Sequence, residues 1–419
     1  MEHRDLNPAK VKRYIAENTS LFPAGTELAV SEIGRNEVDG DGYVNYIYRV
    51  CSANGNSVIL KQAKPYFKYF GKDEYPLTRS RNISEVEIGR IRASIVPQYI
   101  PKILHADNDN FLYVVEDCGH LGIMRFGLSR GKRYPNFPGM MGECIAKCNF
   151  YTSELYLEQG LHKELGRHFT NPEMSRIMEI ILFLREPLLE GADSEIPDPA
   201  HMRISDSFWD NKNARIELFK LRDIYMKKQE CIVHGDLHTS NIMASGGEIK
   251  LIDMEYPHMG PFSSDSGYLL GNLVYTYATW FYHEEWTEDE RARYRDEILG
   301  YIEGTLAEYM RVFRECWSRD AKAMFRPYPE YLESLFLPYL QETAGFMGSQ
   351  ICSRVGGGAE TFDFDVLPNP AKRNEARALA MAMGYALLMR RGDVQTPGDI
   401  TRMIKDCAAE FRNVKCRMG

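Results

Sequence analysis

The first of two acidic segments, residues 234–242, combines a carboxylate and an amide at a spacing suited to phosphoryl transfer. Asp236 stands near its start and Asn241 follows five residues later. An aspartate there could orient an attacking hydroxyl and accept its proton, and the asparagine could hold a metal ion through its side-chain oxygen. By itself the pattern His-x-Asp is common, and a buried imidazole beside a capped loop is an equally good interpretation of it.

The second acidic segment, residues 251–255, favours the catalytic interpretation over the structural one. Asp253 and Glu255 flank one residue at the end of a short apolar run, where both carboxylates could reach a Mg²⁺ ion that bridges nucleotide phosphates. Between the two segments, Gly246 and Gly247 separate two strand-like runs and indicate a tight hairpin, which would bring both segments to the same rim. Because phosphoryl transfer depends mainly on positioning and charge neutralisation, the combined pattern predicts transfer of a phosphoryl group from ATP to a hydroxyl.

The elements before these segments could supply a nucleotide site. Strands are predicted at residues 28–33, 43–50 and 57–62. Gly40 and Gly42 lie in the first loop between them, where glycines let backbone amides approach phosphates closely. Lys61, on the third strand, would direct a cation into the same cleft. Alone, a Gly-Asp-Gly sequence is usually a hairpin turn and a strand lysine is usually solvated, so this prediction rests on their order ahead of the acidic segments.

A predicted helix at residues 78–95 follows and is rich in Glu and Arg. Glu85 is the residue expected to pair with Lys61, and Glu87 is the competing choice. A solvated surface glutamate is the alternative interpretation.

The remaining pattern divides the chain into a small β-rich lobe, residues 1–118, and a large helical lobe, residues 119–419. Strands at 102–104 and 111–117 complete a five-stranded sheet, and the second leads through Glu116 to a hinge where backbone groups would meet adenine. Further helices are predicted at residues 135–167, 172–184, 212–229, 266–283, 288–314, 331–350 and 370–390, with a proline-containing acidic loop at 193–206. The expected fold is therefore α+β, with a small antiparallel sheet in the first lobe, mainly α-helices in the second, and a substrate cleft between them.

Composition narrows the expected partners and location. The chain has 419 residues, 44% of them hydrophobic and 26% charged, and a formal net charge of −8. Without a concentrated basic face, no nucleic-acid partner is expected. The nine scattered cysteines indicate reduced thiols rather than a disulfide framework. No signal peptide stands at the start, and the longest apolar stretch, residues 268–282, is too polar to span a membrane, so a cytoplasmic protein without a membrane partner is expected.

Several stretches together resemble the protein-kinase-like small-molecule kinases, which include aminoglycoside and choline kinases, and within that group the methylthioribose kinases. The resemblance covers nearly the whole chain. It is carried by residues 39–45, 60–66, 75–78 and 116–125, by both acidic segments, and by Gly260-Pro261 with Asp265 and Gly267. Methylthioribose kinases have Asp-x-Glu where protein kinases have Asp-Phe-Gly, and Asp253-Met254-Glu255 is similar to the former.

This resemblance implies a two-lobed protein-kinase-like fold and a homodimer. It also implies that ATP and Mg²⁺ are used to phosphorylate the anomeric hydroxyl of 5-methylthioribose, a small sugar, to its 1-phosphate in methionine salvage. Lys61 would contact the α and β phosphates, Glu85 would orient it, and Asp236 would be the catalytic base. The resemblance places Gly40, Gly42, Asn45, Lys61, Glu85 and Glu116 around the nucleotide, and Asn241, Asp253 and Glu255 around the metal.

Two departures from the family pattern bear on the substrate. Methylthioribose kinases have serine near the position of Asn241, but asparagine is the metal ligand of aminoglycoside and choline kinases. They also carry twin arginines before an Ala-His pair, where this chain has Ser353, Arg354 and Glu360. Arg354 would then hold a sugar hydroxyl or the transferring phosphoryl group. The alternatives are a solvated arginine at a helix end and a shifted alignment that makes the change merely local.

Three other functions therefore stay open at this point. The first is a kinase for a related pentose such as 5-deoxyribose, because of the altered arginine pair. The second is an aminoglycoside- or choline-type phosphotransferase, which the mixture of acids with Arg and Lys disfavours for a cationic aminoglycoside. The third is an inactive nucleotide-binding scaffold, which the presence of all the principal phosphoryl-transfer residues disfavours.

Overall fold

The computed structural model describes residues 5–34, 44–69, 75–184, 199–358 and 361–418. Its first part contains a five-stranded antiparallel sheet in the order β1-β2-β3-β5-β4. The strands are β1 Leu28–Ile33, β2 Tyr46–Ser52, β3 Ser57–Gln62, β4 Ile103–Asp107 and β5 Leu112–Glu116. The predicted five-stranded sheet is confirmed, and β1 and β3 span the predicted residues. Gly40 and Gly42 lie outside the described residues.

Helix α1, Pro8–Asn18, packs against this sheet. Val11, Tyr14 and Ile15 are its buried residues, and their spacing places them on one face of the helix. They form a small core with strand residues such as Leu60, which is 0% exposed. The β-rich part of the molecule therefore has an apolar core of its own, separate from the larger one among the helices.

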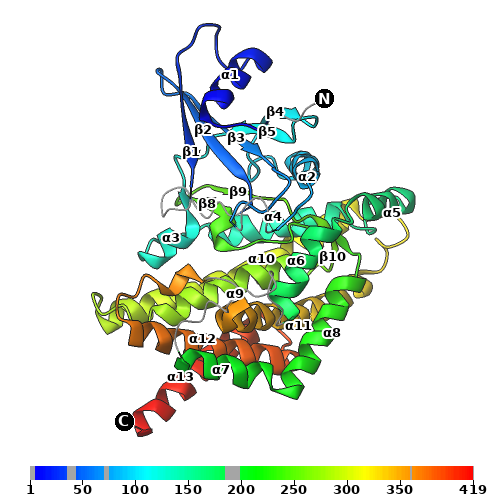
Figure 1. Ribbon diagram of the computed structural model, residues 1–419. Helices are drawn as coiled ribbons and strands as arrows, with labels where there is room; N and C mark the ends of the chain where they lie inside the picture. The colour runs from blue at the N-terminus through cyan, green and yellow to red at the C-terminus, as the bar shows by residue number, and fades with distance from the viewer. Residues whose placement is uncertain (1–4, 35–43, 70–74, 185–198, 359–360, 419) are drawn as a thin grey trace.

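Helix α2, Arg81–Ile95, lies beside β4 and β5 (Figure 1) and begins three residues later than predicted. Its buried residues include Glu85, Ile88 and Arg92, which recur at spacings of three and four and so lie on one face. Charged groups are rarely buried unless they are paired. The inner face of α2 must therefore find partners for its charges inside the molecule.

The rest of the described chain is mainly helical and encloses the larger core (Figure 1). The helices are α3 Met124–Ser129, α4 Phe137–Tyr151, α5 Gln159–His168, α6 Pro172–Phe183, α7 Pro199–Trp209, α8 Lys212–Lys227, α9 Ser264–Thr279, α10 Glu288–Asp320, α11 Pro329–Ser353, α12 Pro370–Met389 and α13 Pro397–Met418. Every residue of α9 is buried, and α10, α11 and α12 pack around it. None of the described helices combines the length and the apolarity needed to cross a membrane.

Two predicted elements of the helical part were wrong. The helix predicted at 135–167 is two helices, because the hydroxyls of Thr152 and Ser153 donate back to the carbonyls of Cys148 and Phe150, both at 2.7 Å, and end α4. Part of the loop predicted at 193–206 is helical, since α7 begins at Pro199. Proline suits the first turn of a helix because that turn needs no N–H from it. Residues 193–198 lie outside the described part.

Short strands also lie outside the main sheet. They are β6 Gly122–Ile123, β7 Cys231–Val233, β8 Ile242–Ala244, β9 Ile249–Leu251 and β10 His258–Gly260. These strands form a two-stranded sheet, β10-β7, and a three-stranded sheet, β6-β8-β9. The antiparallel pair β8–β9 is the hairpin predicted around Gly246 and Gly247, and in Figure 1 it lies between the sheet and the helical region. The N–H of Leu251 donates to the carbonyl of Tyr99 at 2.8 Å. The hairpin is thus attached to the segment that follows α2.

We predict that Gly348→Ala destabilises the helical core. A Cβ at Gly348 would lie 2.6 Å from the carbonyl oxygen of Gly384 and 2.6 Å from the backbone nitrogen of Leu388, both on α12. Because backbone atoms cannot move aside as the end of a flexible side chain can, we expect the free energy of unfolding to fall by about 1–3 kcal/mol. Gly300→Ala is the control, because an exposed helical glycine with no atom nearby should instead gain about 0.5–1 kcal/mol. Urea unfolding measures both, and equal stabilities would contradict the close α11–α12 approach.

Candidate active site

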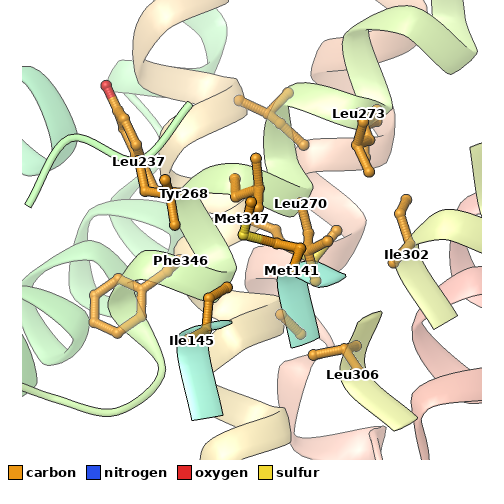
Figure 2. Close-up of a cluster of buried hydrophobic side chains, with 14 of the residues drawn as sticks. Met141, Ile145, Leu237, Tyr268, Leu270, Leu273, Ile302, Leu306, Phe346 and Met347 are labelled. Atoms are coloured by element: carbon orange, nitrogen blue, oxygen red, sulfur yellow. The ribbon is translucent and has the colours of Figure 1, made fainter. Parts of the chain in front are cut away.

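The loop between β7 and β8 is held by the first turn of α9. The Asp265 carboxylate accepts hydrogen bonds from the backbone N–H groups of His234, at 2.7 Å, and Gly235, at 3.0 Å. Gly235 has a φ of +82°, and a Cβ there would lie 2.1 Å from the carbonyl oxygen of Tyr256. Only glycine fits both constraints. Figure 2 shows Leu237 among buried side chains from α4, α9, α10 and α11, so the loop is also anchored to the core.

Arg92 of α2 balances the charge of Asp265. Its Nη2 lies 3.5 Å from Oδ2 of Asp265 and also donates to the carbonyl of Ile232 at 3.3 Å. Both charged side chains are nearly inaccessible to solvent. Sequence reasoning missed Arg92, although its position on the same helical face as Glu85 was a usable signal.

The imidazole of His234 supports the same loop as a neutral group. Burial lowers the pKa of His234 to about 4. Its Nε2 lies 3.1 Å from the carbonyl oxygen of Ile252, and the N–H of Asp236 points to its Nδ1 at 3.4 Å. His234 is therefore the buried imidazole that the alternative interpretation expected. Its structural role does not exclude a chemical role for Asp236, two residues later.

Asp236 is placed as an ionised carboxylate. Nδ2 of Asn241 donates to the backbone carbonyl oxygen of Asp236 at 2.9 Å and lies 3.4 Å from Oδ2 of the Asp236 side chain. Nε2 of His238 also lies 3.4 Å from this Oδ2. Burial alone would raise the pKa of Asp236, but the His238 imidazole and the charge of Arg354 hold it well below the usual range. His238 lies within residues 234–242, but sequence reasoning assigned it no role.

Lys61 pairs with Glu85 rather than with Glu87. Its Nζ lies 2.7 Å from Oε1 of Glu85 and also forms an ion pair with Asp253. Glu87 instead contacts Nε2 of His168 at 2.6 Å. Although burial lowers the pKa of Lys61, the two carboxylates outweigh it and raise the pKa well above its usual value. The lysine is therefore held as a cation at the point where β3, α2 and the second acidic segment meet.

Asp253 stands beside the first acidic segment in a strained conformation. The N–H of Ile252 donates to the carbonyl of Asn241 at 3.0 Å, so the two segments meet as the hairpin prediction required. The φ of Asp253 is +64°, in the left-handed region that costs a non-glycine residue about 1–3 kcal/mol and occurs most at functional sites. Its carboxylate is 32% exposed, enough to meet a ligand.

Glu255 is buried by residues of the β-rich part. Its Oε2 accepts a hydrogen bond from Nδ2 of Asn45 at 2.7 Å and lies 3.3 Å from Nε of Arg81. Burial raises the pKa of Glu255 to about 8. Its Oε1 is buried and receives no hydrogen bond from the described residues. Asn45, predicted beside the nucleotide, thus contacts Glu255, and Arg81 is a partner that sequence reasoning missed.

The donor set near Asp253 suits a cation that is bound partly by other ligands. Among the described residues, no three His, Cys, Asp or Glu side chains gather closely enough to hold a metal ion. Mg²⁺ commonly takes one or two carboxylates and completes its coordination with phosphate and water. Asn241, Asp253 and the unpartnered Oε1 of Glu255 fit that requirement.

Arg354 lies at the end of α11, close to Asp236. Its Nη1 donates to the hydroxyl of Tyr268 on α9 at 2.5 Å, and it is among the charges that lower the pKa of Asp236. It is therefore not a freely solvated arginine. Ser353 is completely buried and donates to the carbonyl of Leu182 at 2.8 Å. Glu360 lies outside the described residues.

Glu116 ends β5 and contacts the hairpin. Its Oε1 lies 3.1 Å from Nζ of Lys250 on β9, and its N–H donates to the carbonyl of Lys102 at 3.0 Å. The chain then turns at Asp117, whose carboxylate accepts a hydrogen bond from Nε of Arg49 at 2.9 Å. Residues 116 and 117 are thus held by ion pairs to both the sheet and the hairpin.

Comparison with known proteins identifies relatives of this chain. Residues 200–316 match the phosphotransferase enzyme family. A methylthioribose kinase of Geobacillus thermodenitrificans is 32% identical over 93% of this chain and 94% of its own length. One from Geobacillus sp. (strain WCH70) is 31% identical over 92% of each chain. A solved choline kinase from Cryptosporidium parvum Iowa II aligns over 98% of this chain and 96% of its own, at 9% identity and a TM-score of 0.46.

The antiparallel sheet, the helical region and the two joined acidic segments define a small-molecule kinase with a two-lobed protein-kinase-like fold. Such an enzyme transfers a phosphoryl group from ATP to a hydroxyl. The chain belongs to the methylthioribose kinase family.

We predict that Gly235→Ala disrupts the loop that carries Asp236. The new Cβ would overlap the backbone of Tyr256 and would require a left-handed alanine, so a loss of several kcal/mol or a displaced loop is expected. Gly246→Ala in the hairpin turn is the control, because no atom lies within 4 Å of its Cβ position. Thermal unfolding and kinase turnover should both fall for Gly235→Ala only. A stable, active Gly235→Ala enzyme would show that the described turn is not required.

Proposed function

We propose that the protein phosphorylates the anomeric hydroxyl of 5-methylthioribose with ATP and produces the 1-phosphate for methionine salvage. The observation that supports this most is the meeting of Asp236 and Asn241 with Lys61 and Asp253 at one rim. Family membership supports the sugar as the acceptor, because the relatives are named methylthioribose kinases.

In this proposal Asp236 is the catalytic base. Its low pKa keeps the carboxylate ionised, so that it can orient the sugar hydroxyl and accept its proton as the new P–O bond forms. Arg354 is within electrostatic reach of Asp236 and contributes a guanidinium that can hold a sugar hydroxyl or the transferring phosphoryl group. Tyr268 would then set the direction of that guanidinium.

The nucleotide would lie on the opposite side of the rim. Lys61 would contact the α and β phosphates, with Glu85 holding its ammonium in place. The loop with Gly40, Gly42 and Asn45 would cover the phosphates, and the backbone near Glu116 would meet adenine. The lobes would then divide at the hinge, as residues 1–118 and 119–419.

Mg²⁺ would be held by Asn241, Asp253 and Glu255. When bound, it would neutralise phosphate charge that the described side chains leave uncompensated. For Glu255 to take part, its carboxylate must be ionised, and the adjacent Arg81 and Lys61 favour that form against the effect of burial. We further propose a homodimer that acts on a small sugar, as the family pattern implies, and a cytoplasmic location, as the composition of the chain indicates.

A related pentose such as 5-deoxyribose is the second candidate acceptor. It is favoured by Ser353, which stands where the family pattern has a second arginine and whose hydroxyl is already engaged by Leu182. A site with one guanidinium in place of two can differ in the sugar it accepts.

Release of ADP measured over a panel of acceptors tests these proposals. The panel contains 5-methylthioribose, 5-deoxyribose, ribose, choline and kanamycin. The highest kcat/KM is expected for 5-methylthioribose. A preference for 5-deoxyribose would select the second candidate, and activity on choline or kanamycin alone would overturn a sugar acceptor.

We predict that Asp236→Asn lowers kcat by about 10²–10⁴-fold while ATP binding is largely retained, because the amide keeps the shape but loses the proton acceptor. Asp223→Asn, at an exposed position of α8, is the matched control and should leave kcat unchanged. Steady-state kinetics and ATP titration measure the two effects. A retained turnover above about a tenth of wild type would remove Asp236 from the base role.

We also predict that Arg354→Lys lowers kcat/KM for the sugar by about 10–100-fold, the effect of losing a charge-assisted contact. Lysine cannot reproduce the planar guanidinium that reaches Tyr268. Arg377→Lys, an arginine of α12 that lies 3.5 Å from Asp365, is the control. Thermal unfolding on the same preparations should change little. Wild-type kinetics for Arg354→Lys would rule out the functional reading, whatever its stability.

A further inference from the structure

The imidazole of His238 is engaged at both of its nitrogens. Its Nδ1 accepts a hydrogen bond from the backbone N–H of Ser240 at 3.2 Å and thereby caps the 3₁₀ turn Thr239–Asn241. Its Nε2 lies 3.4 Å from Oδ2 of Asp236. The residue is only 8% exposed, so few other orientations are open to the ring.

These contacts determine which nitrogen carries the proton. A neutral imidazole has one N–H donor and one acceptor nitrogen. Because Nδ1 receives the N–H of Ser240, it must be the acceptor, and the ring proton is on Nε2. Nε2 is the ring nitrogen that lies nearer Asp236, 3.4 Å from its Oδ2. The same side chain therefore caps the turn through Nδ1 and places its N–H on the nitrogen nearer Asp236.

The same oxygen of Asp236 is approached by a second side chain. Nδ2 of Asn241 lies 3.4 Å from Oδ2, and it also donates to the backbone carbonyl of Asp236 at 2.9 Å. His238 and Asn241 therefore approach Oδ2 together, and neither engages Oδ1. The Tyr268 hydroxyl also interacts with the Asp236 carboxylate, so three side chains restrict how that carboxylate can turn.

We propose that His238 is a positioning residue whose Nε2–H holds Oδ2 of Asp236, so that Oδ1 faces the acceptor hydroxyl. This inference rests on the proposed role of Asp236 as the base. In the step, the hydroxyl proton moves to Oδ1 as the sugar oxygen bonds to the γ-phosphorus. The bond from that phosphorus to the leaving oxygen breaks, and ADP departs with its electron pair. His238 neither gains nor loses a proton.

Two substitutions separate the donor from the cap. In His238→Gln, the side-chain amide can place an N–H near the position of Nε2 but caps the turn poorly. In His238→Asn, the side-chain oxygen can take the place of Nδ1 and cap the turn well, but no donor reaches Asp236. The two variants therefore test the hydrogen-bond donor and the turn cap separately.

If the donor matters, His238→Asn should lower kcat by about 10–100-fold, the range for a charge-assisted hydrogen bond. KM for ATP and the melting temperature should be unchanged. His238→Gln should have a kcat at least about tenfold above that of His238→Asn. A higher kcat for the asparagine variant, or equal losses in both, would mean that His238 serves the loop alone and would overturn the proposal.

A spectroscopic measurement on the wild-type chain keeps this inference separate from the proposed function. With ¹⁵N-labelled histidine, the His238 ring, assigned by its loss in His238→Asn, should show a protonated Nε2 and a bare Nδ1 at neutral pH. This result needs no substrate. The opposite tautomer would overturn the positioning role even in an active sugar kinase. Failure of every sugar in the acceptor panel, with the expected tautomer present, would count against the proposed function instead.

Discussion

The contact on which the rest of the site depends is the one between Asp265 and the backbone of His234 and Gly235. A buried N–H without a partner is costly, and here two adjacent ones are taken by a single carboxylate. Asp265 stands in the first turn of α9, the helix whose residues are all buried. The loop that carries Asp236 is therefore positioned by a helix that is buried along its whole length, and the charge of Asp265 is balanced by Arg92.

That balance gives α2 a role beyond packing. Three of its buried charged residues form ion pairs with three different segments: Arg81 with Glu255, Glu85 with Lys61 and Arg92 with Asp265. Removing one partner from such a pair leaves an uncompensated buried charge, which costs more than the pair contributes when intact. A shift of α2 would disturb all three contacts together. The helix thus couples the β-rich part to the second acidic segment and to the loop of Asp236.

Local signals predicted most of the elements. Alternation and turn residues predicted the sheet, and the helical period predicted α6, α8 and α12 to within two residues at each end, because these helices each bury one face. The break after α4 was missed because it depends on the hydroxyls of Thr152 and Ser153 turning back to the helix, and a serine or threonine does not always do so. No prediction was made for α13, although it is amphipathic.

The sequence by itself determined the residue types of the site and the approach of its two acidic segments. Asn241 and Asp253 lie on either side of one hairpin, whose glycine turn and short strands are local properties of the chain. Only the tertiary structure decided that Glu85 rather than Glu87 meets Lys61 and that Arg354 lies near Asp236. It also decided that Asn45 holds Glu255, 210 residues away in the sequence. Such contacts depend on how the sheet, α2, α9 and α11 pack, and no spacing within one segment encodes that packing.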